Sequence, residues 1–194
     1  MAINVITKPS KLPVELADIK AHLRVTSNDE DGYIADLIEA ATNIAQDEMN
    51  RALITQTIEE YLPRFPTGST IELERAPVQS VSSIQYYDTD NNLQTYSSTN
   101  YEVYTELTPA RIALLNTASW PSTYAKDKAV IITYVAGYGN DQDDVPQDIK
   151  LAIRALVEHY YEHRGIMEAV PNVTLKNIPK SFDYITLKYK VHHV

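Results

Sequence analysis

The 194-residue chain contains no cysteine, and this absence excludes several kinds of site at once. Disulfides, iron–sulfur clusters and cysteine-based zinc sites are all ruled out. The chain also lacks an apolar run long enough to span a bilayer. Its first residues, Met-Ala-Ile-Asn-Val, include no basic region followed by an apolar core. We therefore expect a soluble, unexported protein with no membrane partner.

Basic residues are scarce as well. The chain has 17 Lys and Arg against 26 Asp and Glu, which gives a formal net charge of −9. Sequence-independent binding to nucleic acids comes from Lys and Arg that displace counterions from phosphates, so this charge disfavours a tight nucleic-acid binder. It is compatible with a protein through which DNA merely passes, because an acidic wall repels the phosphate backbone.

Phenylalanine and tryptophan are rare, with two and one residues against 14 tyrosines. Tyrosine is frequent both at protein interfaces and on half-exposed strands, and the composition leaves both interpretations open. Many of the tyrosines fall within residues 54–136, where Thr, Ser and β-branched residues dominate and turn signals recur about every dozen residues. This pattern predicts an antiparallel β meander or small sandwich with strands at 58–64, 70–74, 81–87, 93–96, 101–105, 111–115 and 129–135.

Two amphipathic segments precede this β-rich part of the chain. The first, residues 13–25, has Pro13 at its start, where the missing N–H costs nothing. Before the second, Ser27 and Glu30 have the spacing of a capping box and predict a helix that ends near Leu53. Apolar residues recur in it at three- and four-residue intervals, so this helix needs a packing partner.

A third amphipathic segment begins at Pro146 and ends at Gly165, a residue that can terminate a helix. We expect it to pack on the second helix and to bury Ile153 and Leu156 against Leu37 and Ile44. The sequence therefore predicts an α+β fold in which the N-terminal helix pair and the C-terminal helix pack together around an inserted β region.

One pattern in the third helix suggests metal chemistry. His159, Glu162 and His163 fit the H-x-x-E-H arrangement of a family of zinc proteases, in which two His bind zinc and the Glu acts as general base. The flanking sequence offers no His or Cys as a third zinc ligand, only acids such as Glu168. Tyr160 continues the apolar face of this helix, so that face is expected to pack against the protein. A zinc-dependent hydrolase is therefore an alternative hypothesis, and we assign no catalytic, cofactor-binding or metal-binding residue.

Several longer segments together resemble one known family. They are "LPVELADIKAHLRV", "DEDGYIADLIEAATNIAQDEMNRALITQTIEEYL", "APVQSVSSIQYYD", "ALLNTASWP", "VIITYVAGYG" and "VPQDIKLAIRALVEHYYEHRG". In this order they resemble the head-to-tail connector (adaptor) family of tailed bacteriophages, whose members form a ring beneath the portal. The resemblance covers most of residues 12–165 and is weakest from residue 166 onward.

The resemblance implies a structural virion protein at the portal vertex or neck, made in the cytoplasm of the bacterial host. We expect a ring of about twelve copies that joins the portal protein to a stopper or tail-completion protein and continues the DNA channel. DNA would pass through without sequence-specific binding. The protein would have no enzymatic activity and no cofactor. A small-ligand or carbohydrate-binding module on the Tyr-rich β region is a further alternative.

For domain organisation we expect one composite domain over residues 1–165, with helical parts at 12–53 and 146–165 and the β-rich insertion at 54–136. Residues 166–194 are expected to form an extended tail, with residues 181–190 as a further short helix or strand. The tail carries seven large apolar residues without clear periodicity. We expect it to be an arm that binds a partner through Ile166, Val173, Leu175, Ile178, Phe182, Ile185 and Leu187; a tail folded on its own domain is the alternative.

Overall fold

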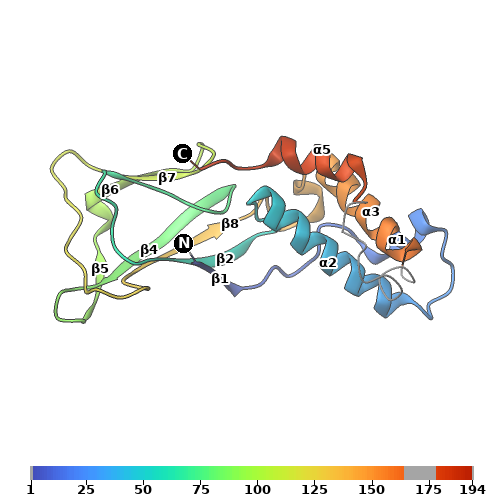
Figure 1. Cartoon of the computed structure of the whole chain (residues 1–194), viewed down its shortest axis with the longest axis horizontal. Coiled ribbons are helices and arrows are strands. Elements are labelled where there is room, and N and C mark those ends of the chain that lie inside the picture. Colours follow the sequence, from blue (N-terminus) through green and yellow to red (C-terminus); the bar gives the residue numbers. More distant parts are fainter. Residues whose placement is uncertain (1, 164–177, 194) are drawn as a thin grey trace, which may run out of the picture. The chain divides into compact units, whose positions relative to one another are not determined.

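The computed structural model describes residues 2–163 and 178–193, and within them the chain forms two compact units. The β unit comprises Met1–Pro9, Asn50–Tyr138 and Val191–Val194, and the helical unit comprises Ser10–Met49 and Gly139–Lys190. The predicted α+β class is confirmed (Figure 1). The division follows the predicted boundary between helical and β-rich parts, but the β unit also takes in residues from both ends of the chain.

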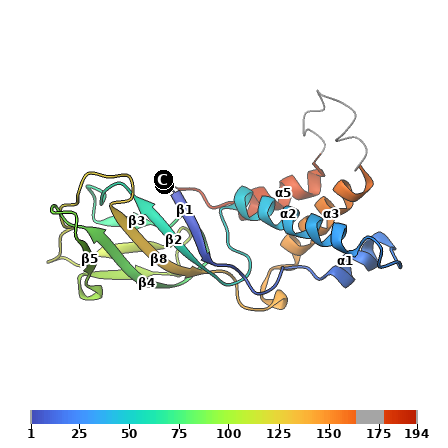
Figure 2. The same cartoon turned by 90° about the horizontal axis from the view of Figure 1, so that it is seen from below.

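The β unit is built from two antiparallel sheets (Figure 2). The larger has the strand order β1-β2-β8-β4-β5 and the smaller the order β3-β7-β6. All seven predicted strands are present, and an eighth, β1, precedes them. The strands are β1 (Ala2–Thr7), β2 (Gln56–Leu62), β3 (Thr70–Glu72), β4 (Val78–Tyr87), β5 (Leu93–Tyr96), β6 (Tyr101–Tyr104), β7 (Arg111–Leu114) and β8 (Val130–Ala136).

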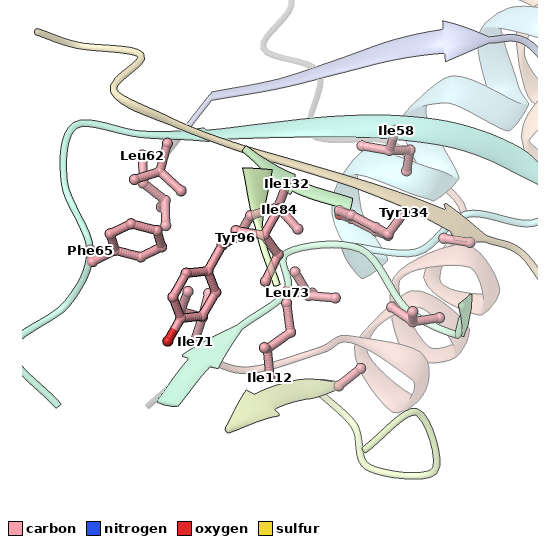
Figure 3. Close-up of a cluster of buried hydrophobic side chains, with 14 of the residues drawn as sticks. Ile58, Leu62, Phe65, Ile71, Leu73, Ile84, Tyr96, Ile112, Ile132 and Tyr134 are labelled. Atoms are coloured by element: carbon pink, nitrogen blue, oxygen red, sulfur yellow. The ribbon is translucent and has the colours of Figure 1, made fainter. Parts of the chain in front are cut away.

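Side chains of both sheets meet in one hydrophobic core (Figure 3). In β2 and β8 every second residue is buried, because successive side chains of a strand point to opposite faces. Ile58 of β2 and Ile132 of β8 come from the larger sheet, and Ile71 of β3 and Ile112 of β7 come from the smaller one. This shared core makes the β region a small two-sheet unit, one of the two forms that the sequence predicted.

The helical unit contains α1 (Leu16–Leu23), α2 (Asp31–Met49), α3 (Gln147–Glu162) and α5 (Lys180–Tyr189). The backbone of Arg24 is left-handed and ends α1, and Pro146 and Pro179 directly precede α3 and α5. The predicted packing of the helix pair on α3 is confirmed by direct contacts among the three helices. An ion pair between Asp18 and Arg154 and a hydrogen bond between His22 and Glu158, each at 3.0 Å, join α1 to α3. None of the described helices could cross a membrane, since none is both long and apolar enough.

Two details of the helix predictions were wrong. Ser27 does not form a capping box; its hydroxyl accepts from the backbone N–H of Asp29 at 3.2 Å, and α2 begins only at Asp31. This local hydrogen bond gives the Ser27 hydroxyl a backbone partner in the turn before α2, so it does not cap the helix. Serine side chains commonly bond to nearby backbone groups in this way. Leu37 and Ile44 are half-buried, because the centre of the buried face of α2 is formed by other residues: Ile34, Ile38, Ala41, Ala45 and Met49.

The prediction of an extended tail was also wrong for the part of the tail that the structure describes. Residues 180–189 form α5 (Figure 1), which packs on α3 and α2. Phe182 of this helix is only 1% exposed. Phe182 is therefore part of the helical unit's own core and not free to bind a partner. Ile178 and Ile185 are half-buried, and Leu187 is 65% exposed. Ile166, Val173 and Leu175 lie outside the described residues.

We expect Leu156→Ala to lower the free energy of unfolding by about 2 to 5 kcal/mol, since Leu156 is fully buried on α3 and its truncation leaves a cavity. Chemical denaturation followed by circular dichroism measures this. Leu151→Ala is the matched control, because Leu151 lies on the same helix and is 55% exposed. Equal denaturation midpoints for Leu156→Ala and the parent would show that α3 does not pack as described.

Candidate interaction surfaces

The histidine motif lies at the C-terminal end of α3. The rings of His159 and His163 are 4.5 Å apart, and Nδ1 of His163 donates to the backbone carbonyl of His159 at 2.9 Å. Partial burial, together with the charge of His163, lowers the pKa of His159 and favours its neutral form. Among residues 2–163 and 178–193, no group of three or more His, Cys, Asp or Glu side chains could hold a metal ion. The described structure therefore gives the zinc-hydrolase hypothesis no ligand set.

Five aromatic residues of the β unit, Phe65, Tyr86, Tyr96, Tyr101 and Trp120, pack against one another. Phe65 stacks on Trp120 with ring centroids 4.8 Å apart, and Tyr96 lies 5.3 Å from Trp120 and 6.1 Å from Tyr101. The Trp120 indole N–H donates to the Gly68 carbonyl at 2.9 Å, so the polar part of this ring has a partner within the chain. Carbohydrate-binding modules need aromatic faces that are open to the ligand. The rings of this cluster cover each other instead, which argues against their use as such a surface.

A buried carboxyl group lies in the core of the β unit. The side chain of Glu60 on β2 is 0% exposed, and its Oε2 accepts hydrogen bonds from the Glu74 N–H at 3.0 Å and the Tyr134 hydroxyl at 3.2 Å. Its Oε1 has no hydrogen-bond partner among the described residues. Burial raises the pKa of the Glu60 carboxyl to about 7, and also raises the pKa of Tyr134. We did not identify Glu60 from the sequence, although it alternates with Ile58 and Leu62 on the buried face of β2.

The last described residues belong to the β unit. Val191 is 2% exposed, and its carbonyl accepts from the Asn50 side-chain amide at 3.2 Å. The His193 ring lies 3.4 Å from the Glu74 carboxylate and 3.9 Å from that of Glu72. Residues 191–193 thus lie within the β unit and do not form an extended arm.

The most exposed large apolar side chains of the described residues lie on two helices of the helical unit. Tyr184 and Leu187 of α5 are 73% and 65% exposed, and Leu151 of α3 is 55% exposed. Exposed apolar side chains that gather on one face mark interaction sites more often than isolated ones do. Nothing in the sequence distinguished these residues from core residues, because apolar identity alone does not show which side chains another element covers.

A second exposed surface lies at the edge of the larger sheet. The strand β1 pairs with β2 on one side and forms an edge of that sheet, and its Val5 and Ile6 are 38% and 47% exposed. Edge strands offer unpaired backbone groups to other chains. The candidate functional sites among the described residues are therefore two surfaces that could bind partners: the exposed face of α3 and α5, and the edge strand β1.

Solved structures with a similar fold come from gene transfer agent particles. No curated protein matches the chain. Among solved structures, the fold is similar to a chain in the virion of a native gene transfer agent (GTA) particle, with a TM-score of 0.78 and 20% identity over 100% of this chain and 97% of that one.

Two further similar chains come from GTA necks. One is in the neck of an empty GTA particle computed with C6 symmetry (TM-score 0.80, 20% identity), and the other in the neck of a native GTA particle computed with C12 symmetry (TM-score 0.77, 19% identity). Both matches cover 100% of this chain and 97% of the other.

The sequence itself matches a family that agrees with the resemblance to phage connectors. The profile of the head completion protein family matches residues 14–191, which takes in both units and extends well into the segment where that resemblance was weakest. The chain belongs to the head completion protein family.

Proposed function

We propose that this protein forms a ring in the virion neck that joins the portal to the next neck or tail component and continues the DNA channel. The main support is the similarity of the whole chain to chains of GTA necks, one of them computed with C12 symmetry, together with the family match. Because the similarity covers both units, we propose that both take part in a ring of about twelve copies.

A structural role also fits the chemistry of the described residues. Their most exposed apolar side chains are on helix surfaces, and the histidine pair of α3 has no third ligand among them. The net charge of −9 per copy would repel DNA from the ring and let it pass without adhering. We therefore propose that the protein performs no catalysis. The two faces of the assembled ring would bind partners, and its central opening would let DNA pass.

The partners we propose are the portal protein on one face of the ring and a stopper or tail-completion protein on the other. The ring would be built from heterologous contacts, in which one surface of a copy meets a different surface of the next. Like-charged copies repel until their packing surfaces are aligned. The portal would therefore act as a template for closure.

Electron microscopy of the protein mixed with its portal tests this proposal. We expect the chain alone to be monomeric or weakly associated at about micromolar concentration, and to form a closed ring on the portal. The portal alone is the control for the added density. A stable dimer that persists in the presence of portal, or a portal without added density, would contradict the proposal.

A further inference from the structure

The outward face of α5 carries residues that the helical unit leaves exposed. Phe182 and Thr186 point into the unit, and Lys180, Tyr184 and Leu187 lie on the opposite side at spacings of four and three residues. On an α-helix this spacing places side chains on one face. Tyr184 and Leu187 are more exposed than any other large apolar residue of the described chain.

An ion pair aligns α5 with α3 and extends this face. Lys188 Nζ lies 2.7 Å from the Asp148 carboxylate, which joins the C-terminal end of α5 to the first turn of α3. The two helices are therefore antiparallel at this contact. Leu151 is three residues after Asp148 and Tyr184 is four before Lys188, so the two exposed side chains are about level along the helix pair. We call Lys180, Tyr184, Leu187 and Leu151 the α5 stripe.

The exposed face of α2 has the opposite character. The helix contains five acidic residues and no Lys or Arg, whereas residues 180–190 contain three Lys and one Asp. Asp36, Glu39, Ala40 and Asn43 are exposed and lie opposite the buried face of α2 that includes Ile38 and Ala45. We call these four residues the α2 stripe. It offers small and acidic side chains, which complement the bulky apolar side chains and the single basic residue, Lys180, of the α5 stripe.

We propose that the α5 stripe of one copy packs on the α2 stripe of the next copy and forms the contact that repeats around the ring. This inference rests on the proposed function. The two stripes lie on different helices of one chain and differ in charge, so the contact is heterologous and can repeat from head to tail, as a closed ring requires. Tyr184 is the central anchor, because tyrosine contributes strongly when it is buried at the centre of an interface.

The absence of cysteine makes this contact directly testable. The double variant Ala40→Cys/Leu187→Cys carries one thiol on each stripe, and both positions are exposed, so the fold should tolerate the changes. A short bismaleimide is added to the protein assembled on portal, and denaturing electrophoresis resolves the products. We expect a ladder of covalent multimers, because every copy is linked to two neighbours.

Three controls define the result. An equal mixture of the two single-cysteine variants should give dimers and no ladder, because each linked pair has no further thiol. Thr26→Cys/Leu187→Cys places the first thiol on an exposed turn outside the α2 stripe and should give no ladder. Leu187→Cys alone should remain monomeric on the gel; dimers from it would mean that α5 meets α5, which would overturn the proposal.

Electron microscopy of the same samples separates this inference from the proposed function. Rings on the portal without a ladder would overturn the stripe contact and leave the ring function intact. The absence of rings with the parent protein would overturn both. As an independent readout, Lys180→Glu should weaken ring assembly about tenfold or more by placing like charges together, and Asp36→Lys in the same chain should restore it. Normal assembly of Lys180→Glu would count against the proposed contact.

Discussion

Phe182→Ala is expected to lower the free energy of unfolding by about 3 to 5 kcal/mol, the range for removing a fully buried phenylalanine. Phe182 is 1% exposed on α5, where the helix packs on α3 and α2. If the segment were an intermolecular arm, its truncation would leave the isolated chain as stable as the parent. Urea denaturation of the isolated protein followed by circular dichroism therefore distinguishes an integral helix from an arm.

The matched control is Tyr184→Ala, two residues away on the same helix. Tyr184 is 73% exposed, so its truncation should change the stability by no more than about 0.5 kcal/mol. The same variant should impair ring assembly, because Tyr184 is the proposed anchor of the contact between copies. Similar stabilities for the two variants would mean that α5 does not pack through Phe182.

The second large effect is expected from Glu60→Gln at alkaline pH. The carboxyl pKa is about 7 in the folded protein against 4.5 for the ordinary group. Between these values the folded state binds more protons than the unfolded state, so the contribution of Glu60 to stability is lost as the pH rises from about 4.5 to about 7. Above pH 7 the buried charge costs about 3 kcal/mol.

Glutamine mimics the protonated acid and has no charge to bury. The variant should therefore exceed the parent in stability, and the difference should grow by about 2 kcal/mol from pH 5 to pH 8. Denaturant titrations at the two pH values measure this. Glu59→Gln is the control, because Glu59 is the adjacent, half-exposed residue of β2 and accepts from the Tyr61 hydroxyl on the other face. A pH-independent difference for Glu60→Gln would show that the carboxyl is not buried as described.

Where hydrophobic periodicity is strong, the sequence predicted the fold well. The apolar periodicity of α2 and α3 and the alternation along β2 and β8 indicate directly which side chains are buried. These elements were found within a few residues of their predicted positions. The strand β1 was missed because nearly all of its side chains are exposed, so no alternation marks it. Its partner, β2, is far away in the sequence.

The C-terminal segment shows a different limit. Only Phe182 and Thr186 of α5 are buried, and so short a pattern did not distinguish a helix from a strand. Glu60 could have been found, because a charged residue on the apolar face of a strand predicts a buried carboxyl group. The α5 stripe could not, since the exposure of Tyr184 and Leu187 depends on which elements pack over them in three dimensions.

The most direct test of the ring is native mass spectrometry of the purified portal complex with and without this protein. We expect the complex to gain mass in a single step that corresponds to a whole ring of about twelve chains, because each heterologous contact supports the next. A gain of one or a few chains per portal, or no gain at all, would contradict it.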